Sequence, residues 1–158
     1  MLEKIVSSYA KQVEHFFAHL DLLCAHKIED ILLQCTGKIV LVGVGKSGII
    51  AEKLAKTLVA TGTLALSMSA MDALHGDIGL LKQEDVVVFL SKSGGTEELI
   101  NLVPFVKARG ATTLAWVCHK GSQLEKMVDE TMVLPIEQEV CPFGLAPTCS
   151  STVQLIFG

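Results

Sequence analysis

Hydrophobic residues recur every three or four positions over the first thirty-odd residues, which is the spacing of an amphipathic helix. The residues of this series are Leu2, Ile5, Val6, Tyr9, Val13, Phe16, Phe17, Leu20 and Leu23. The pattern predicts one or two helices that pack one face against the rest of the protein. It indicates no function beyond that packing.

After Gly37 the pattern changes to short β-branched runs that alternate with helix-length segments. We expect five strands, over 39–42, 64–66, 86–90, 112–117 and 131–134. The run V-V-V-F-L at 86–90 is apolar at every position, as in strands of a parallel sheet that is covered on both faces. The pattern therefore predicts an α/β fold, a three-layer α/β/α sandwich around a five-stranded parallel sheet, with helices at the N-terminus.

Composition narrows the class of protein. Half of the 158 residues are hydrophobic, 19% are charged and the mean hydropathy is +0.49, which excludes disorder and predicts a large core in a single domain over 1–158. The formal net charge is −4, with 13 basic against 17 acidic residues. This balance disfavours a nucleic-acid partner, because neutralising phosphates takes a concentrated basic surface.

Signals for export or membrane insertion are missing from the sequence. A membrane span needs about 20 consecutive apolar residues, whereas the strongest runs, 39–44 and 86–90, have the length of strands, so we expect a soluble protein without a membrane partner. The N-terminus has no basic segment followed by an apolar one and does not resemble a signal peptide. Five cysteines without a C-x-x-C pair disfavour a disulfide framework and a zinc site, so we expect a reducing, cytoplasmic location.

A glycine-rich segment, V-G-V-G-K-S-G, follows the first expected strand, where parallel sheets bind their ligands. Its residues include Gly43, Gly45, Lys46, Ser47 and Gly48. Glycines let the backbone approach a ligand, and the following helix offers free N–H groups to an anion. A dinucleotide site would need an acidic residue before Asp72, and a nucleoside triphosphatase loop would need Gly at Val40. A tight turn without a ligand is the other alternative, and Lys46 makes it less attractive.

A second loop, S-K-S-G-G-T-E-E at 91–98, follows the third expected strand and gives the stronger signal. The hydroxyls of Ser91, Ser93 and Thr96 flank the flexible Gly94 and Gly95 just before a helical run. Hydroxyl and amide donors in this arrangement suit a phosphate monoester. The alternative is that Thr96 caps the next helix and the two glutamates favour its positive end. Capping accounts for the residue types but not for their density.

Together the two loops resemble the sugar isomerase (SIS) domain, whose strand-end signature Ser-x-Ser-Gly-x-Thr is matched by Ser91, Ser93, Gly94 and Thr96. Two further segments, A-L-H-G-D-I-G at 73–79 and E-V-C-P-F-G-L-A-P-T-C-S-S-T at 139–152, are similar to the arabinose-5-phosphate isomerases. That family interconverts D-arabinose 5-phosphate and D-ribulose 5-phosphate for Kdo synthesis, and hence for lipopolysaccharide. The resemblance covers nearly the whole chain.

The resemblance implies a site for a phosphorylated sugar at the matching positions of this chain. The implied phosphate-binding residues are Ser47, Ser91, Ser93 and Thr96, and the implied substrate loops contain Gly45 and Gly94. The implied catalytic groups are Lys46, Glu98 and Glu139, with His75 close to the active site. In the phosphate loop, Lys92 and Gly95 stand where many relatives have a small amide and Glu.

An aldose-ketose isomerisation moves one proton between adjacent carbons through an enediol. Glu139 and Glu98 are the candidate bases, and a carboxylate in a mostly apolar cleft is expected to have a raised pKa. Glu139 is preferred, because Glu98 lies so near the phosphate loop that it would orient the sugar or Lys46 instead. Lys46 would place positive charge near the sugar oxygens or the phosphate, and His75 would assist ring opening. No step needs a metal or an organic cofactor, and His75 with Asp77 is weak evidence for a metal site. A solvated Glu139 and a packing role for His75 are the alternatives.

Members of the family generally continue through an S-H-P-G-G segment and then a pair of cystathionine-β-synthase-type (CBS) domains. The present chain ends before both, in a helix that opens near Pro147 and is still apolar at Gly158, so we expect it to be C-terminally truncated. A non-catalytic phosphosugar sensor that regulates another domain is the alternative function, and Lys46 with Glu139 favours the isomerase. A homodimer or homotetramer is expected, because the apolar N-terminal helix leaves surface to cover.

Overall fold

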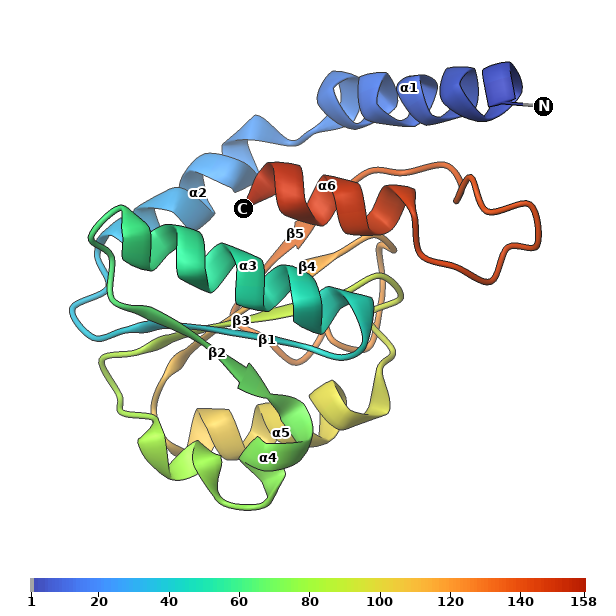
Figure 1. The fold of residues 1–158 in the computed structure, drawn as a ribbon. Helices are drawn as coiled ribbons and strands as arrows, with labels where there is room; N and C mark the ends of the chain where they lie inside the picture. The colour runs from blue at the N-terminus through green and yellow to red at the C-terminus, as the bar shows by residue number, and fades with distance from the viewer. Residues whose placement is uncertain (1) are drawn as a thin grey trace.

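Five short segments pair in parallel to form one sheet in the order β2-β1-β3-β4-β5 (Figure 1). The computed structural model describes residues 2–158. The strands are β1 (Ile39–Gly43), β2 (Ala65–Ser69), β3 (Val86–Ser91), β4 (Thr112–Val117) and β5 (Glu130–Val133). The predicted fold class and its five parallel strands are confirmed.

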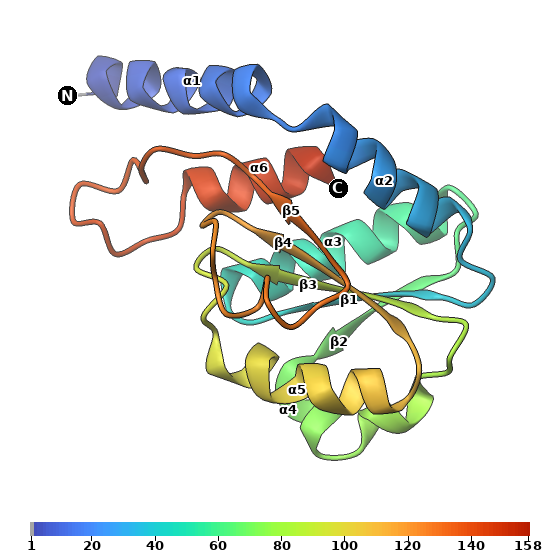
Figure 2. The ribbon, with the colours of Figure 1, turned by 180° about the vertical axis from the view of Figure 1, so that it is seen from behind.

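Helices cover both faces of the sheet, as Figures 1 and 2 show from opposite sides. One face carries α1 (Leu2–His19), α2 (Leu22–Leu33), α3 (Lys46–Ala60) and α6 (Cys149–Phe157). The other face carries α4 (Ala70–Leu74), the 3-10 helix η1 (Asp77–Leu80) and α5 (Glu97–Ala108). Within residues 2–158, the combination of length and apolar content that a bilayer crossing requires is found in none of the helices.

Strand β3 shows why the central segments are apolar at every position. Val86, Val88 and Leu90 pack into the core beneath α2, α3 and α6, whereas Val87 and Phe89 pack into the core above α4 and α5. Alternate side chains of a strand point to opposite faces, and both faces here are covered. Each such buried side chain contributes roughly 1.5–3 kcal/mol relative to an exposed one, so a polar residue on either face would be costly.

The boundaries differ from the expected ones where local chemistry intervenes. The N-terminal helical region is two helices, because Asp21 caps α2 by accepting a hydrogen bond from the Cys24 N–H at 3.1 Å. Strand β2 extends to Ser69 rather than ending at 66, and as an edge strand it exposes Ser67 and Ser69. The hydrophobic pattern did not predict residues 67–69 as strand, because the two serines interrupt the apolar run. Strand β5 begins one residue earlier than expected.

At the amino edge of the sheet, Asp85 fixes the entry into β1 and β3. Its carboxylate accepts hydrogen bonds from the Lys38 Nζ at 2.5 Å, the Lys38 N–H at 3.0 Å and the Lys82 N–H at 2.7 Å. Burial acts to raise the pKa of Asp85, but these contacts outweigh it and hold the pKa below its usual value. This edge is closed by structural contacts, and the glycine and hydroxyl loops lie at the opposite, carboxyl edge.

Candidate functional site

The glycine loop and the hydroxyl loop leave the sheet from neighbouring strands. Gly43, the last residue of β1, lies opposite Leu90 of β3, yet the chain runs from β1 outward to β2 before it returns to β3. The loops after β1 and β3 therefore lead to helices on opposite faces, α3 and α5 (Figures 1 and 2). Ligands of such sheets bind in the crevice at this reversal of strand order.

The glycine loop is built by a close approach between β1 and α3. A Cβ on Gly43 would lie 2.6 Å from the backbone carbonyl of Ser47, so only glycine allows this contact. Gly45 has φ of 61°, the left-handed region, and precedes the first residue of α3, Lys46, whose side chain is exposed. Ser47 donates its hydroxyl to the Gln154 Oε1 at 3.1 Å, which joins α3 to α6.

A cavity of about 330 Å³ opens between the glycine loop and the end of β2. Gly43 and Gly45 form one wall, and Ser67, Ser69 and Met71 contribute to the other. The volume is at the small end of the range of ligand sites. Residues 91–96 do not line this cavity, so the hydroxyl loop lies outside it.

The hydroxyls of the loop 91–96 are bonded to one another and to the loop backbone. The buried Ser91 Oγ accepts the Gly94 N–H at 3.0 Å and lies 2.9 Å from the Thr96 Oγ1, while the Ser93 Oγ accepts the Gly95 N–H at 3.1 Å. Thr96 occupies the N-cap position of α5, but its side chain makes no capping bond. The alternative of a capping role for the Thr96 hydroxyl is therefore wrong, although Thr96 stands at the N-cap position, and the loop presents a preformed, polar turn.

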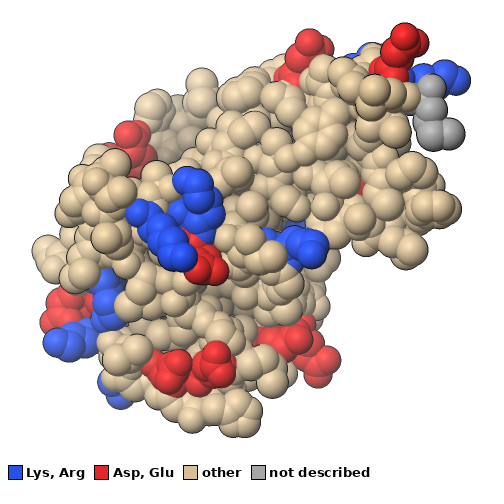
Figure 3. All heavy atoms as spheres, in the orientation of Figure 1, with Lys and Arg blue, Asp and Glu red and all other residues tan. Residues whose placement is uncertain are grey.

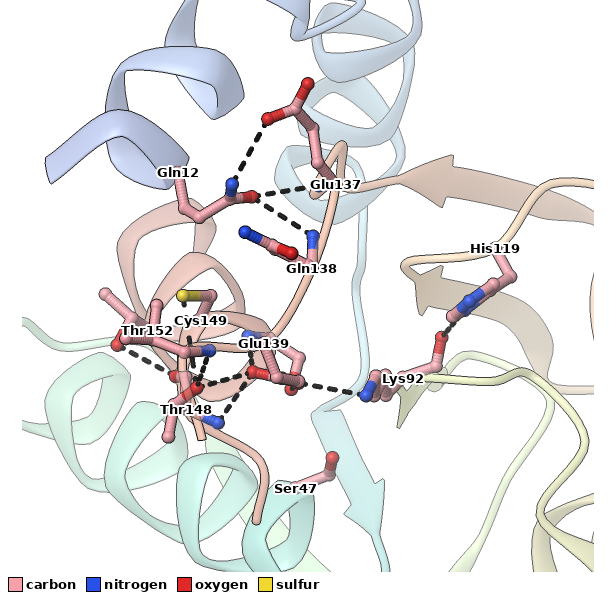
Figure 4. Close-up of polar contacts among 12 residues, drawn as sticks. Gln12, Ser47, Lys92, His119, Glu137, Gln138, Glu139, Thr148, Cys149 and Thr152 are labelled. Carbon is pink, nitrogen blue, oxygen red and sulfur yellow. Dashed lines mark hydrogen bonds and ion pairs between the residues drawn. The ribbon is translucent and has the colours of Figure 1, made fainter. Parts of the chain in front are cut away.

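Glu139 lies at the centre of a larger network, drawn in Figure 4. Its Oε2 accepts the Thr148 N–H and the Thr148 hydroxyl, both at 2.8 Å, and the Ser150 N–H at 3.3 Å. Its Oε1 accepts the Ser150 hydroxyl and pairs with the Lys92 Nζ at 3.2 Å. The side chain is 4% exposed. Glu139 therefore neutralises the positive N-terminal end of α6 from a position nine to eleven residues earlier in the chain.

These donors determine the charge of Glu139. Burial acts to raise its pKa, but hydrogen bonds from Ser150, Thr148 and Lys92 outweigh burial and lower the pKa from 4.5 to about 2. The expectation of a raised pKa at Glu139 is wrong, because the cleft around the carboxylate supplies donors rather than apolar groups. The alternative of a solvated loop residue is wrong as well, since the side chain is buried.

The segment that carries Glu139 is also tied to the first helix. Gln12 of α1 is 2% exposed, and its Oε1 accepts the N–H groups of Glu137 at 2.9 Å and Gln138 at 3.3 Å. Its Nε2 donates to the Glu137 Oε2 at 3.2 Å (Figure 4). The segment after β5 is thus held at one point by α1 and at another by the N-terminus of α6.

Three residues of the expected catalytic set stand apart from this network. Lys46 and His75 are exposed and Glu98 is half-buried in the first turn of α5. Among residues 2–158, no side-chain hydrogen bond or ion pair joins any of the three to another residue of the expected set. Within the same range, no group of three or more His, Cys, Asp and Glu side chains is placed to hold a metal ion.

Sequence reasoning missed the partners of Glu139. Ser150 and Thr148 lie in the segment T-C-S-S-T at the start of α6, and a helix N-terminus near a conspicuous carboxylate is a signal that could have found them. Gln154 follows Ser150 by one helical turn and is buried beside Ser47. One face of α6 therefore meets both the Glu139 segment and the start of α3.

Three comparisons place this geometry among known proteins. The SIS domain model matches residues 32–158. Arabinose 5-phosphate isomerase KdsD of Pseudomonas aeruginosa is 40% identical over 129 residues, which cover 82% of this chain and 40% of the relative. An Escherichia coli CFT073 protein, solved in complex with arabinose 5-phosphate, is 36% identical with a TM-score of 0.92, over 98% of this chain and 82% of that chain.

The fold occurs outside this group as well. The NanR protein of Vibrio vulnificus, complexed with ManNAc-6P, matches with a TM-score of 0.82 at 20% identity, over 99% of this chain and 58% of that chain. At that identity the likeness shows the fold alone. The present chain spans about two fifths of the length of the first curated relatives it matches.

Proposed function

The chain belongs to the SIS domain family, and on that premise we propose that it binds a phosphorylated sugar and interconverts D-arabinose 5-phosphate and D-ribulose 5-phosphate. The observation that carries the proposal is the hydroxyl loop 91–96 beside the glycine loop at the reversal of strand order. The similarity to an arabinose 5-phosphate isomerase at 40% identity supports the choice of sugar.

In this proposal the two loops bind different parts of the substrate. Ser91, Ser93 and Thr96 bind the phosphate together with backbone N–H groups near Gly94, and the first turn of α5 adds its positive end. Gly45 lines the cavity beside the glycine loop, and Ser47 follows it in the first turn of α3. Lys46, exposed at the first position of α3, supplies positive charge to the sugar oxygens.

The isomerisation requires one carboxylate that accepts a carbon-bound proton. We assign this role to Glu98 rather than Glu139, because all the oxygen lone pairs of Glu139 are occupied by donors in the structure. The C2 proton of the aldose passes to Glu98 and leaves an enediolate across C1 and C2, with its negative charge on O1 near Lys46. The proton then returns to C1, while the O2 hydroxyl proton moves to O1 and C2 becomes the ketone carbon. His75 assists opening of the sugar ring.

A non-catalytic phosphosugar sensor is the second candidate function. The fully hydrogen-bonded Glu139 carboxylate favours it over an isomerase in which Glu139 is the base, because a carboxylate in that state is a poor acceptor for a further proton. For the isomerase we also propose a cytoplasmic location and a place in Kdo and lipopolysaccharide synthesis. The five cysteines, all inside residues 2–158, are free thiols, which fits a reducing compartment.

A coupled assay of arabinose 5-phosphate conversion, with a parallel calorimetric titration of the same sugar, tests the proposal. We expect Lys46→Ala and Glu98→Gln each to lower turnover about 100-fold or more, because one removes charge stabilisation and the other the base. Lys53→Ala and Glu97→Gln are the matched controls, from the same helices, and should retain turnover. Saturable binding without turnover in the unsubstituted chain would favour the sensor, and absence of both would overturn the phosphosugar proposal.

A further inference from the structure

Lys92 links the hydroxyl loop to Glu139. It lies between Ser91 and Ser93, and its carbonyl oxygen accepts the Cys118 N–H at 2.9 Å and the His119 Nδ1–H at 3.1 Å. These bonds fix the Lys92 backbone against the end of β4. From that fixed point the side chain crosses to the Glu139 Oε1, 3.2 Å away, as Figure 4 shows. The Lys92 ammonium group therefore joins the hydroxyl loop to the Glu139 segment.

Lys92 supplies the positive charge that contacts the Glu139 carboxylate. The other groups that contact the Glu139 carboxylate, from Thr148 and Ser150, are neutral donors. Two thiols also face it, Cys118 from the end of β4 and Cys149 from α6; burial, with the nearby Glu139 charge, raises the pKa of Cys118 to about 12, and burial raises the pKa of Cys149. Both thiols are neutral at pH 7, so the ammonium balances the carboxylate.

The ammonium of Lys92 has capacity for a second anion. A lysine head group carries three N–H donors that rotate about the side-chain axis, and the Glu139 contact uses one direction. The Lys92 side chain is 39% exposed, whereas its carboxylate partner is 4% exposed. Part of the Lys92 side chain is therefore open to solvent, and its backbone lies between Ser91 and Ser93, two of the residues proposed to hold a phosphate. A doubly charged phosphate placed there would otherwise meet the Glu139 carboxylate without a cation between them.

We propose that Lys92 is a further phosphate-binding residue of this chain, whose ammonium is shared between the Glu139 carboxylate and the phosphate of the bound ligand. The inference rests on the phosphosugar binding of the proposed function and deepens it. It also makes Lys92 a positioning residue for Glu139, because the charge that holds Glu139 in place is the charge that the ligand engages. A small amide at this position would lack this charge.

Calorimetric titrations with inorganic phosphate and with arabinose 5-phosphate test the binding half of the proposal. We expect Lys92→Met to weaken binding of both probes about tenfold or more, since it removes one charge-assisted hydrogen bond. Lys92→Arg should restore most of the affinity. Lys56→Met is the matched control, because Lys56 is also paired with a glutamate, Glu52, but lies on the exposed face of α3. Unchanged affinity in Lys92→Met, with the fold intact by circular dichroism, would overturn the proposal.

The carboxyl 13C resonance of Glu139 tests the sharing. Saturating phosphate should raise the pKa of Glu139 by about one unit in the unsubstituted chain, because the bound anion draws part of the ammonium away. In Lys92→Met the pKa should be raised already and should respond less to phosphate. A purely structural Lys92 would change the pKa of Glu139 on substitution and leave phosphate affinity unaltered.

The two proposals fail in different ways. If Lys92→Met does not fold, the unsubstituted chain still tests the inference. A Glu139 pKa that does not change at saturating phosphate would contradict it. Binding that behaves as expected without any isomerisation would contradict the proposed isomerase and leave the role of Lys92 standing.

Discussion

The Glu139 carboxylate is ionised because of its neighbours, and this gives the stability of the fold a particular pH dependence. A carboxyl whose pKa is lower in the folded than in the unfolded chain stabilises the fold at pH values above the unfolded pKa, and it loses that contribution as the pH falls through the folded pKa. For Glu139 the interval runs from its ordinary value of 4.5 down to about 2. Asp85, whose pKa is also lowered, acts in the same direction.

The free energy of unfolding of Glu139→Gln should therefore lie furthest below that of the unsubstituted chain at neutral pH. The difference should shrink as the pH falls from about 5 towards about 2, because the unfolded chain takes up a proton at Glu139 over this interval while the folded carboxylate stays charged down to its own lowered pKa. Urea unfolding at a series of pH values measures both curves. Glu137→Gln, at an exposed side chain, is the control. Parallel curves for Glu139→Gln and the unsubstituted chain would contradict the pKa of Glu139.

Among single residues, the sequence predicted which side chains belong to the candidate site, but not their hydrogen-bond partners or their pKa values. Ser91 and Thr96 are joined at the strand end, where the residue types and the strand boundary predicted them to lie. The environment of Glu139 was not predictable, because its donors come from Thr148 and Ser150 after an intervening loop. A carboxylate in an apolar cleft and one at a helix N-terminus have opposite pKa shifts. The sequence around Glu139 does not say which it is.

At the scale of elements, the contact between β1 and α3 depends on the absence of a side chain at Gly43. Gly43→Ala should lower the free energy of unfolding by about 1–3 kcal/mol, because the added methyl would press on the Ser47 carbonyl and the Gly48 nitrogen. Urea denaturation measures the loss. Gly79→Ala is the control, since a Cβ there meets no atom within 4 Å. Equal stability of the two variants would contradict the close approach.

The elements themselves were largely predictable, because a sheet covered on both faces demands uninterrupted apolar strands such as β3. The bounds of the edge strand β2 were predicted less well. In strand β2 the exposed Ser67 and Ser69 interrupt the apolar positions, so the hydrophobic pattern alone does not show where the strand ends. The break between α1 and α2 depends on one capping aspartate, Asp21, which the hydrophobic spacing alone does not reveal.

At the scale of the whole molecule, the two N-terminal helices leave much apolar surface uncovered. Figures 1 and 2 show α1 lying along the outside of the fold above α6, and Figure 3 shows wide uncharged areas between small groups of charged side chains. The exposed apolar residues of these helices are Leu2, Ile5, Val6, Phe17, Leu22, Leu23 and Leu33. A surface of this kind favours association with a second copy.

Sedimentation velocity should therefore find a dimer or a larger assembly of this chain. Replacing Phe17 and Leu23, which are 60% and 85% exposed, with glutamate should shift the chain towards the monomer without unfolding it. Leu64→Glu, at an exposed position between α3 and β2, is the control. A monomer at all concentrations of the unsubstituted chain would contradict the expected self-association.

The contact of Gln12 with residues 137 and 138 makes the first helix a reporter of the site. The Gln12 side chain accepts two backbone N–H groups that lie 125 and 126 positions further along the chain. The amide hydrogens of Glu137 and Gln138 therefore exchange with solvent only when α1 moves away from that segment. Any ligand that steadies the Glu139 segment must slow this exchange by the same free energy with which docked α1 strengthens ligand binding. Such a ligand would couple the crevice thermodynamically to helix α1, which reaches this region through Gln12 and also through the Tyr9 hydroxyl, a donor to the Thr148 carbonyl at 3.3 Å.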